Sequence, residues 1–180
     1  MDEEIIIKTA VNDEDREKSR TLINRAFRER QHVSRKDRDT ITFNETKETL
    51  LGDNKYLFML LKNESNYLIG TALMNINRSK ELGLYADIQF LAVTPENWGQ
   101  NFGSKLLLHI ENSGKIFSCN NSYLSIIYHP KHPQKNLVQW YLRQGYQFHE
   151  EFNINEQDKA KWFSPEYCSE ITAHFYRKEI

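Results

Sequence analysis

The chain has 180 residues, of which 39% are hydrophobic and 27% are charged, and its formal net charge at pH 7 is −1. These values are typical of one soluble globular domain with room for a substantial core. A near-zero net charge argues against nucleic acid as the main partner, so the basic residues between Arg25 and Arg38 are interpreted as a solvated helix end and loop.

The N-terminal part of the chain predicts a strand followed by two helices. Residues 4–11 have the composition of a strand, and Asn12 or Asp13 can cap a helix whose apolar residues keep helical spacing as far as Phe27. The pattern is lost from residue 28 to residue 42, where we expect a loop. A second, short helix is predicted over residues 45–51 and ends at a glycine.

The rest of the chain predicts strands interrupted by two helices. Two strands pair around a polar turn, and a long strand and a helix follow them. The predicted strands are 56–62, 67–76, 84–93, 122–128, 146–152 and 171–177, and the predicted helices are 103–117 and 136–143. Because there is no internal repeat and no low-complexity linker, we expect a single mixed α/β domain over residues 1–180.

A loop with two glycines, Trp98-Gly-Gln-Asn-Phe-Gly103, joins the long strand to the helix after it. It does not match the phosphate loop Gly-x-x-x-x-Gly-Lys-Ser/Thr, because Ser104 and Lys105 stand in the reverse order, and it has too few glycines for a dinucleotide fold. The first amides of a helix nevertheless lack internal partners and favour an anion. The loop is therefore a candidate anion site, with Ser104 as a helix-entry residue or phosphate contact rather than a nucleophile.

Two further segments flank this loop, Leu91-Ala-Val93 before it and Trp140-Tyr-Leu-Arg-Gln-Gly-Tyr146 after it. Together the three segments resemble the GNAT superfamily of N-acetyltransferases. The usual loop of that family is Gln/Arg-x-x-Gly-x-Gly/Ala, and its later motif is Tyr-x-x-x-Gly-Phe/Tyr. Here Trp98 replaces the Gln or Arg, and Asn101 replaces the first glycine, with an asparagine being able to adopt left-handed backbone.

The resemblance implies a mainly antiparallel sheet of about seven strands flanked by helices, in which two splayed parallel strands, 84–93 and 122–128, form an acetyl-CoA cleft. Strand backbone would pair with pantetheine, one strand amide would polarise the thioester carbonyl, and the loop amides would hold the pyrophosphate. The implied cofactor-binding residues are Leu91, Ala92, Val93, Trp98, Gly99, Gln100, Asn101, Phe102, Gly103 and Ser104, with Gln134 where many members have an asparagine that contacts pantetheine.

The resemblance also implies direct attack of an amine on the thioester, for which the protein supplies positioning, an acid and a base. Tyr141 matches the usual proton donor to the departing CoA thiolate. The alternative is that Tyr141 only packs in the core. Trp140 and Tyr141 are neighbours, and we expect Trp140 to be the one that faces inward.

Three candidates are open for the base. Asp87 lies at even spacing from Gln89, Leu91 and Val93, which predicts that it shares their face of the strand. His129 follows the next strand, and its ordinary pKa of about 6.5 suits proton removal near neutral pH. A chain of water molecules is the third candidate.

The expected acceptor is a primary amine of a small molecule or peptide, bound by the residues around 28–42, the second helix and 155–167. The rival hypothesis is a CoA-binding or protein-interaction domain without catalysis. No histidine has a partner at metal-ligand spacing, so no metal is expected. Without a disulfide framework, a secretory signal or an apolar span, the sequence predicts no membrane partner and a cytoplasmic protein, with the nucleus as an alternative, as a monomer or homodimer.

Overall fold

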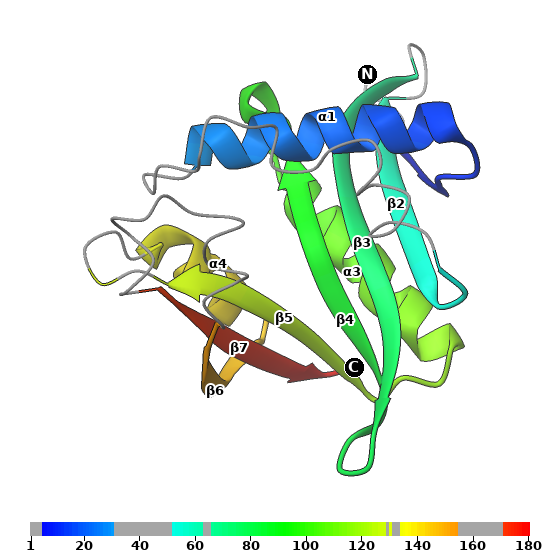
Figure 1. Cartoon of the computed structure of the whole chain (residues 1–180). Helices are drawn as coiled ribbons and strands as arrows, with labels where there is room; N and C mark the ends of the chain where they lie inside the picture. The colour runs from blue at the N-terminus through cyan, green and yellow to red at the C-terminus, as the bar shows by residue number, and fades with distance from the viewer. Residues whose placement is uncertain (1–4, 31–51, 63–65, 129, 131–133, 155–170) are drawn as a thin grey trace.

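The computed structural model describes residues 5–30, 52–62, 66–128, 130, 134–154 and 171–180. Its strands form one seven-stranded sheet in the order β1-β2-β3-β4-β5-β7-β6 (Figure 1). The elements in chain order are β1 (Ile5–Thr9), α1 (Asp13–Arg30), β2 (Lys55–Lys62), β3 (Tyr67–Ser79), β4 (Gly83–Val93), the 3-10 turn η2 (Pro95–Asn97), α3 (Phe102–Ile116), β5 (Asn121–Tyr128), α4 (Lys135–Arg143), β6 (Gln147–Asn153) and β7 (Thr172–Glu179).

The predicted mixed α/β fold is confirmed. Every predicted strand is present, and its ends differ from the prediction by a few residues at most. The sequence did not predict the 3-10 turn η2, which begins where Pro95 prevents β4 from continuing. The helix predicted over 45–51 lies outside the described residues.

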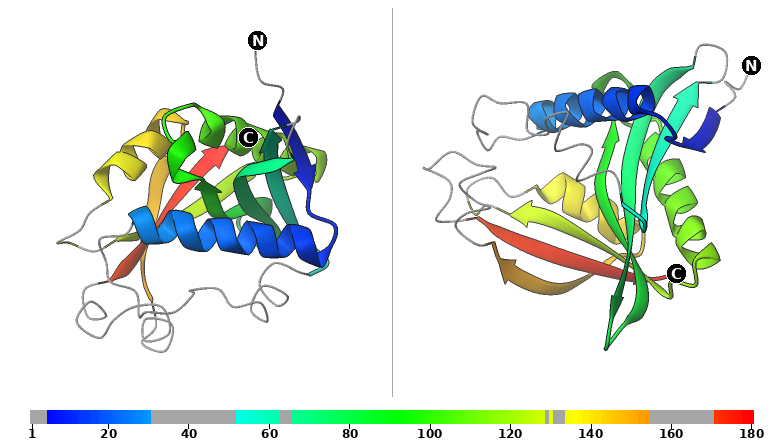
Figure 2. Two further views of the ribbon diagram at one scale, coloured as in Figure 1. Left: turned by 90° about the horizontal axis from the view of Figure 1, so that it is seen from above. Right: turned by 45° about the vertical axis from the view of Figure 1, so that its right-hand side comes forward.

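Two layers of helix enclose the sheet, with α1 on one face and α3 and α4 on the other (Figures 1 and 2). The main core lies under α3, which buries Phe102, Leu106, Leu107 and Ile110 against the sheet. Gly114 belongs to this helix, and a Cβ there would lie 3.2 Å from the Cβ of Ala86. A glycine at this position therefore lets α3 approach β4 closely.

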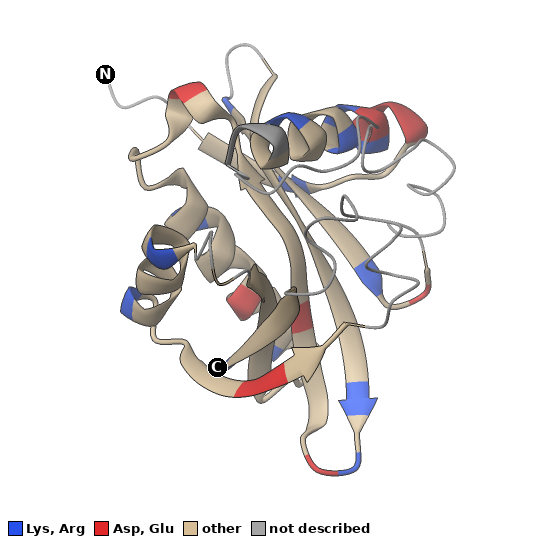
Figure 3. Ribbon diagram, turned by 60° about the vertical axis from the view of Figure 1, so that its left-hand side comes forward, with Lys and Arg blue, Asp and Glu red and all other residues tan. Residues whose placement is uncertain are grey.

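Helix α1 covers the other face and forms a smaller core with the end of β4. Leu22, Ile23 and Ala26 are buried there together with Ala92 of β4. The outer side of α1 carries charges of both signs, with red at one end of the helix and blue further along it in Figure 3, and includes ion pairs such as Arg16–Asp13. None of the described helices is long and apolar enough to cross a membrane.

Strands β4 and β5 are the parallel pair of the sheet, and they stay together over only part of their length. Their ladder runs from Tyr85 opposite Asn121 to Ile88 opposite Leu124. Beyond it, β4 continues to Val93 beside β3, whereas β5 continues to Tyr128 beside β7. The two strands consequently diverge towards their carboxyl ends (Figure 1), as the resemblance implied.

Candidate functional site

A bulge in β4 lies where the two strands diverge. Phe90 has a φ of 52°, and the pairing with β3 shifts there, so that one extra residue is inserted in β4. Leu91 and Val93 consequently pack in the core under α3 and α4, while Phe90 and Ala92 pack with α1.

This bulge overturns the predicted placement of Asp87. Gln89 lies opposite Leu73, which packs with Phe90 on the α1 side of the sheet. Asp87 and Gln89 therefore lie on the α1 side of the sheet, and the prediction that they share a face with Leu91 and Val93 is wrong. An inserted residue reverses the alternation of side chains, and even spacing in the sequence cannot detect it.

The backbone groups of Val93 point away from β3, on the edge of β4 where the pairing with β5 has ended. The amide of Thr94 donates to the carbonyl of Ile69 on β3 at 2.9 Å, and backbone groups of successive strand residues point to opposite sides. The Val93 carbonyl accordingly faces away from β3. It accepts a hydrogen bond of 2.7 Å from the indole Nε1 of Trp98, whose ring is half-buried against the main core.

The loop between η2 and α3 adopts left-handed backbone at Gly99, with a φ of 79°, and at Asn101, with a φ of 64°. Asn101 therefore adopts the left-handed backbone that an asparagine can take in place of glycine. The amide of Lys105 donates to the Asn101 carbonyl at 3.1 Å as the helix begins. The amides of Phe102, Gly103 and Ser104 precede that bond, at the positive end of the helix dipole.

A surface cluster supports η2, which leads into this loop. Arg25 of α1 contacts Glu96 through both guanidinium ends, at 3.2 and 3.0 Å, and the Tyr67 hydroxyl donates to Glu96 at 2.8 Å. That hydrogen bond to the carboxylate raises the pKa of Tyr67. This cluster could not be predicted from the sequence. Its partners are separated by 71 and by 29 positions along the chain, and contacts over such separations leave no pattern in a single sequence.

Helix α4 buries Tyr141 rather than Trp140. Tyr141 is 7% exposed, and its ring meets the Trp140 and Tyr146 rings edge-on at 4.6 and 5.8 Å. The prediction that Trp140 faces inward is wrong, because Tyr141 follows the core-facing Leu137 by four residues and Val138 by three. Trp140 is half-buried and covers the start of α3.

Two other predicted residues lie near β5 and α4. Gln134 precedes α4, and its side-chain amide donates to the Ile127 carbonyl of β5 at 3.3 Å, which ties the helix to the divergent end of that strand. His129 lies outside the described residues, so its candidacy as a base stays a prediction.

Asp87 lies within the ladder that β4 shares with β5, one pair before its end, opposite Asn75 on β3 and Tyr123 on β5. Its carboxylate accepts a hydrogen bond of 2.5 Å from the side-chain amide of Gln89. Burial raises the pKa of Asp87, and the hydrogen bond from Gln89 opposes that rise. The nearby Tyr123 ring lies 5.2 Å from that of Tyr85, and its buried hydroxyl has no hydrogen-bond partner among the described residues.

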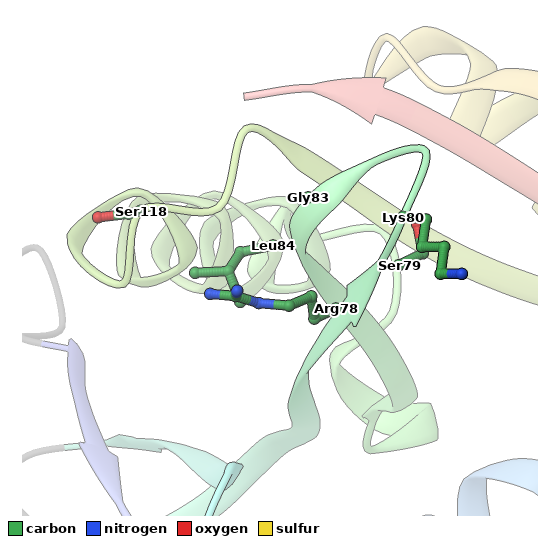
Figure 4. A pocket seen from close by; sticks show the side chains of 6 residues that line it. All are labelled: Arg78, Ser79, Lys80, Gly83, Leu84 and Ser118. Carbon is green, nitrogen blue, oxygen red and sulfur yellow. The ribbon is translucent and has the colours of Figure 1, made fainter.

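A hollow at the opposite end of β4 does not belong to this arrangement. It lies on the β3–β4 hairpin, where the side chains of Arg78 and Lys80 extend away from each other (Figure 4). They do not converge on one point, as a charged ligand would require. Within the described ranges, no three His, Cys, Asp or Glu residues are grouped as metal ligands.

Comparisons with known proteins identify the family of this chain and the proteins that share its fold. The model of the acetyltransferase (GNAT) family matches residues 18–146. The ribosomal-protein-S18-alanine N-acetyltransferase from Escherichia coli superposes with a TM-score of 0.68 at 15% identity, over 98% of this chain and 94% of that chain. A GNAT-family acetyltransferase from Streptococcus pneumoniae gives 0.63 at 16%, over 98% and 100%.

A third solved structure, the NatC complex bound to Gag peptide and CoA, contains a chain that superposes with a TM-score of 0.66 at 15% identity, over 98% of this chain and 99% of that chain. At such identities these structures show that the fold is shared. No curated protein matches the chain.

Proposed function

The chain belongs to the acetyltransferase (GNAT) family, and on that premise we propose that it transfers the acetyl group of acetyl-CoA to a primary amine of a small molecule or peptide, as a single catalytic domain. The GNAT fold binds acetyl-CoA. The observation that carries the proposal is the divergence of β4 from β5 next to the loop that begins α3.

Two groups of residues would bind two different parts of acetyl-CoA. Backbone groups of Leu91 and Val93 line the open edge of β4 and would pair with pantetheine, as an added strand does. The amides from Gly99 to Ser104 would hold the pyrophosphate, where the helix dipole favours negative charge. Gln134 is a further candidate contact from the side of α4.

Acetyl-CoA supplies an activated thioester, and the residues of this chain would hold and move the protons. Asp87 on the α1 side would accept the proton that the amine loses. Tyr141 would donate the proton that the CoA sulfur takes up. These two residues lie on different sides of the sheet, consistent with an amine and a leaving thiol that separate in opposite directions.

The test is the variant Tyr141→Phe, which keeps the ring in its buried place and removes the hydroxyl. We expect kcat in a CoA-release assay over a panel of amines and N-terminal peptides to fall about 100-fold, the usual contribution of a general acid. Calorimetry should give the same acetyl-CoA affinity for both proteins.

An unchanged kcat would restrict Tyr141 to core packing. If the wild-type protein binds acetyl-CoA but acetylates none of the acceptors, the rival hypothesis of a non-catalytic CoA-binding domain replaces the enzyme.

A further inference from the structure

We infer that Trp98 is a positioning residue that fixes the spacing between the two halves of the cofactor site. One half is the open edge of β4 at Val93, and the other is the loop from Gly99 to Ser104 at the start of α3. This inference rests on the proposed function, because acetyl-CoA is the ligand that would span both halves.

The indole joins the loop directly to the edge of the strand. Its Nε1 donates to the Val93 carbonyl at 2.7 Å, and that carbonyl faces away from β3, on the side where the ladder with β5 has already ended at Ile88. The bond therefore lies between the strand end and the loop. A carbonyl oxygen has two lone pairs, so Val93 can keep this bond while it accepts another from a pantetheine amide.

Among the residues that the structure describes, the other side-chain contacts of η2 lie elsewhere. Asn97 donates to Thr94 at 2.7 Å, and Glu96 contacts Arg25 on α1 and Tyr67 at the start of β3. These contacts hold the turn to its own start, to the outer helix and to β3. The Trp98 ring, in contrast, is half-buried against the main core, so the loop cannot slide along β4 unless the ring leaves its site and its hydrogen bond breaks.

The first experiment compares Trp98→Phe with the wild-type protein for two ligands in calorimetry. Acetyl-CoA would span both halves of the site, whereas 3′-phospho-ADP carries the nucleotide and its pyrophosphate without the pantetheine arm. The variant loses one neutral hydrogen bond that holds the two halves in register. We expect its affinity for acetyl-CoA to fall about tenfold and its affinity for 3′-phospho-ADP to stay within about twofold of the wild-type value.

Two results would overturn the inference. One is an unchanged acetyl-CoA affinity. The other is an equal loss for both ligands, which would mean that the indole shapes the loop alone. Failure of the wild-type protein to bind acetyl-CoA is a different result and would overturn the proposed function instead.

A second measurement uses the wild-type protein, in case Trp98→Phe does not fold. The indole N–H signal of Trp98 can be assigned by NMR from its loss in that variant, or by elimination with Trp140→Phe and Trp162→Phe. We expect it to be protected from solvent exchange both without ligand and with saturating acetyl-CoA. Loss of protection on binding would show that the bond breaks, which contradicts a positioning role.

Discussion

Asp87 is a carboxylate that folding makes harder to ionise, and this property predicts both its catalytic behaviour and its effect on stability. Burial raises its pKa above the ordinary value of 3.8. If Asp87 is the base, Asp87→Asn should lower kcat about 100-fold or more. In the wild-type protein, kcat/KM should rise with pH as this carboxyl loses its proton, at a pH above the ordinary aspartate range. An unchanged kcat in the variant would leave His129 or water as the base.

The same substitution should raise thermal stability at neutral pH. Below the pKa of the unfolded carboxyl, Asp87 is protonated in both states, and its burial costs little. As pH rises through the higher pKa of the folded state, wild-type stability is lost, because the folded protein must hold a desolvated charge. Asp87→Asn should therefore have a higher Tm above that pKa and an equal Tm near pH 3. An advantage that does not depend on pH would contradict this account.

At the scale of elements, an ion pair with a buried carboxylate and a partly exposed lysine holds α3 to β7. Lys178 Nζ lies 2.7 Å from a carboxylate oxygen of Glu111, whose side chain is 5% exposed. Lys178→Met leaves that carboxylate buried without its cation, and we expect a loss of about 3 kcal/mol of unfolding free energy. Urea-induced unfolding of the variant and the wild-type protein measures this loss of stability. The control is the double variant with Glu111→Leu, which should recover most of the loss, and a double variant as unstable as the single one would contradict the pair's role.

The order and type of the elements could be predicted from the sequence because each depends on local patterns. Alternating apolar residues mark the strands, and Gly99 and Gly103 mark the loop before α3. Two side-chain placements could not be predicted. The bulge at Phe90 depends on pairing with β3, and the inward turn of Tyr141 depends on how α4 seats against the sheet. Both errors concern which face a residue occupies, and tertiary contacts decide that.

At the scale of the whole molecule, the fold leaves β4 and β5 joined at one end and separate at the other. β4 is held by β3 and α1 on one side, and β5 is held by β7 on the other. A ligand that pairs with β4 between them would connect parts of the sheet that share only the short ladder from Tyr85 to Ile88. Such a ligand should stabilise the native state as a unit, because the unfolded chain has no such edge.

Acetyl-CoA at about 100 times its Kd should therefore add about 2.7 kcal/mol to the stability of the native state, or roughly 5–10 °C in Tm for a chain of this size. Gly103→Val should remove most of this shift, since even a Cβ at that position would lie 3.3 Å from the Trp140 ring and larger atoms would displace the start of α3. Differential scanning fluorimetry with and without acetyl-CoA measures the Tm shift of the wild-type protein and of the variant. The control is Gly52→Ala, because the nearest described atoms to a Cβ there belong to the flexible Lys55 side chain, at 3.5 Å, and this variant should leave the shift intact. An undiminished shift in Gly103→Val would place the pyrophosphate away from the start of α3.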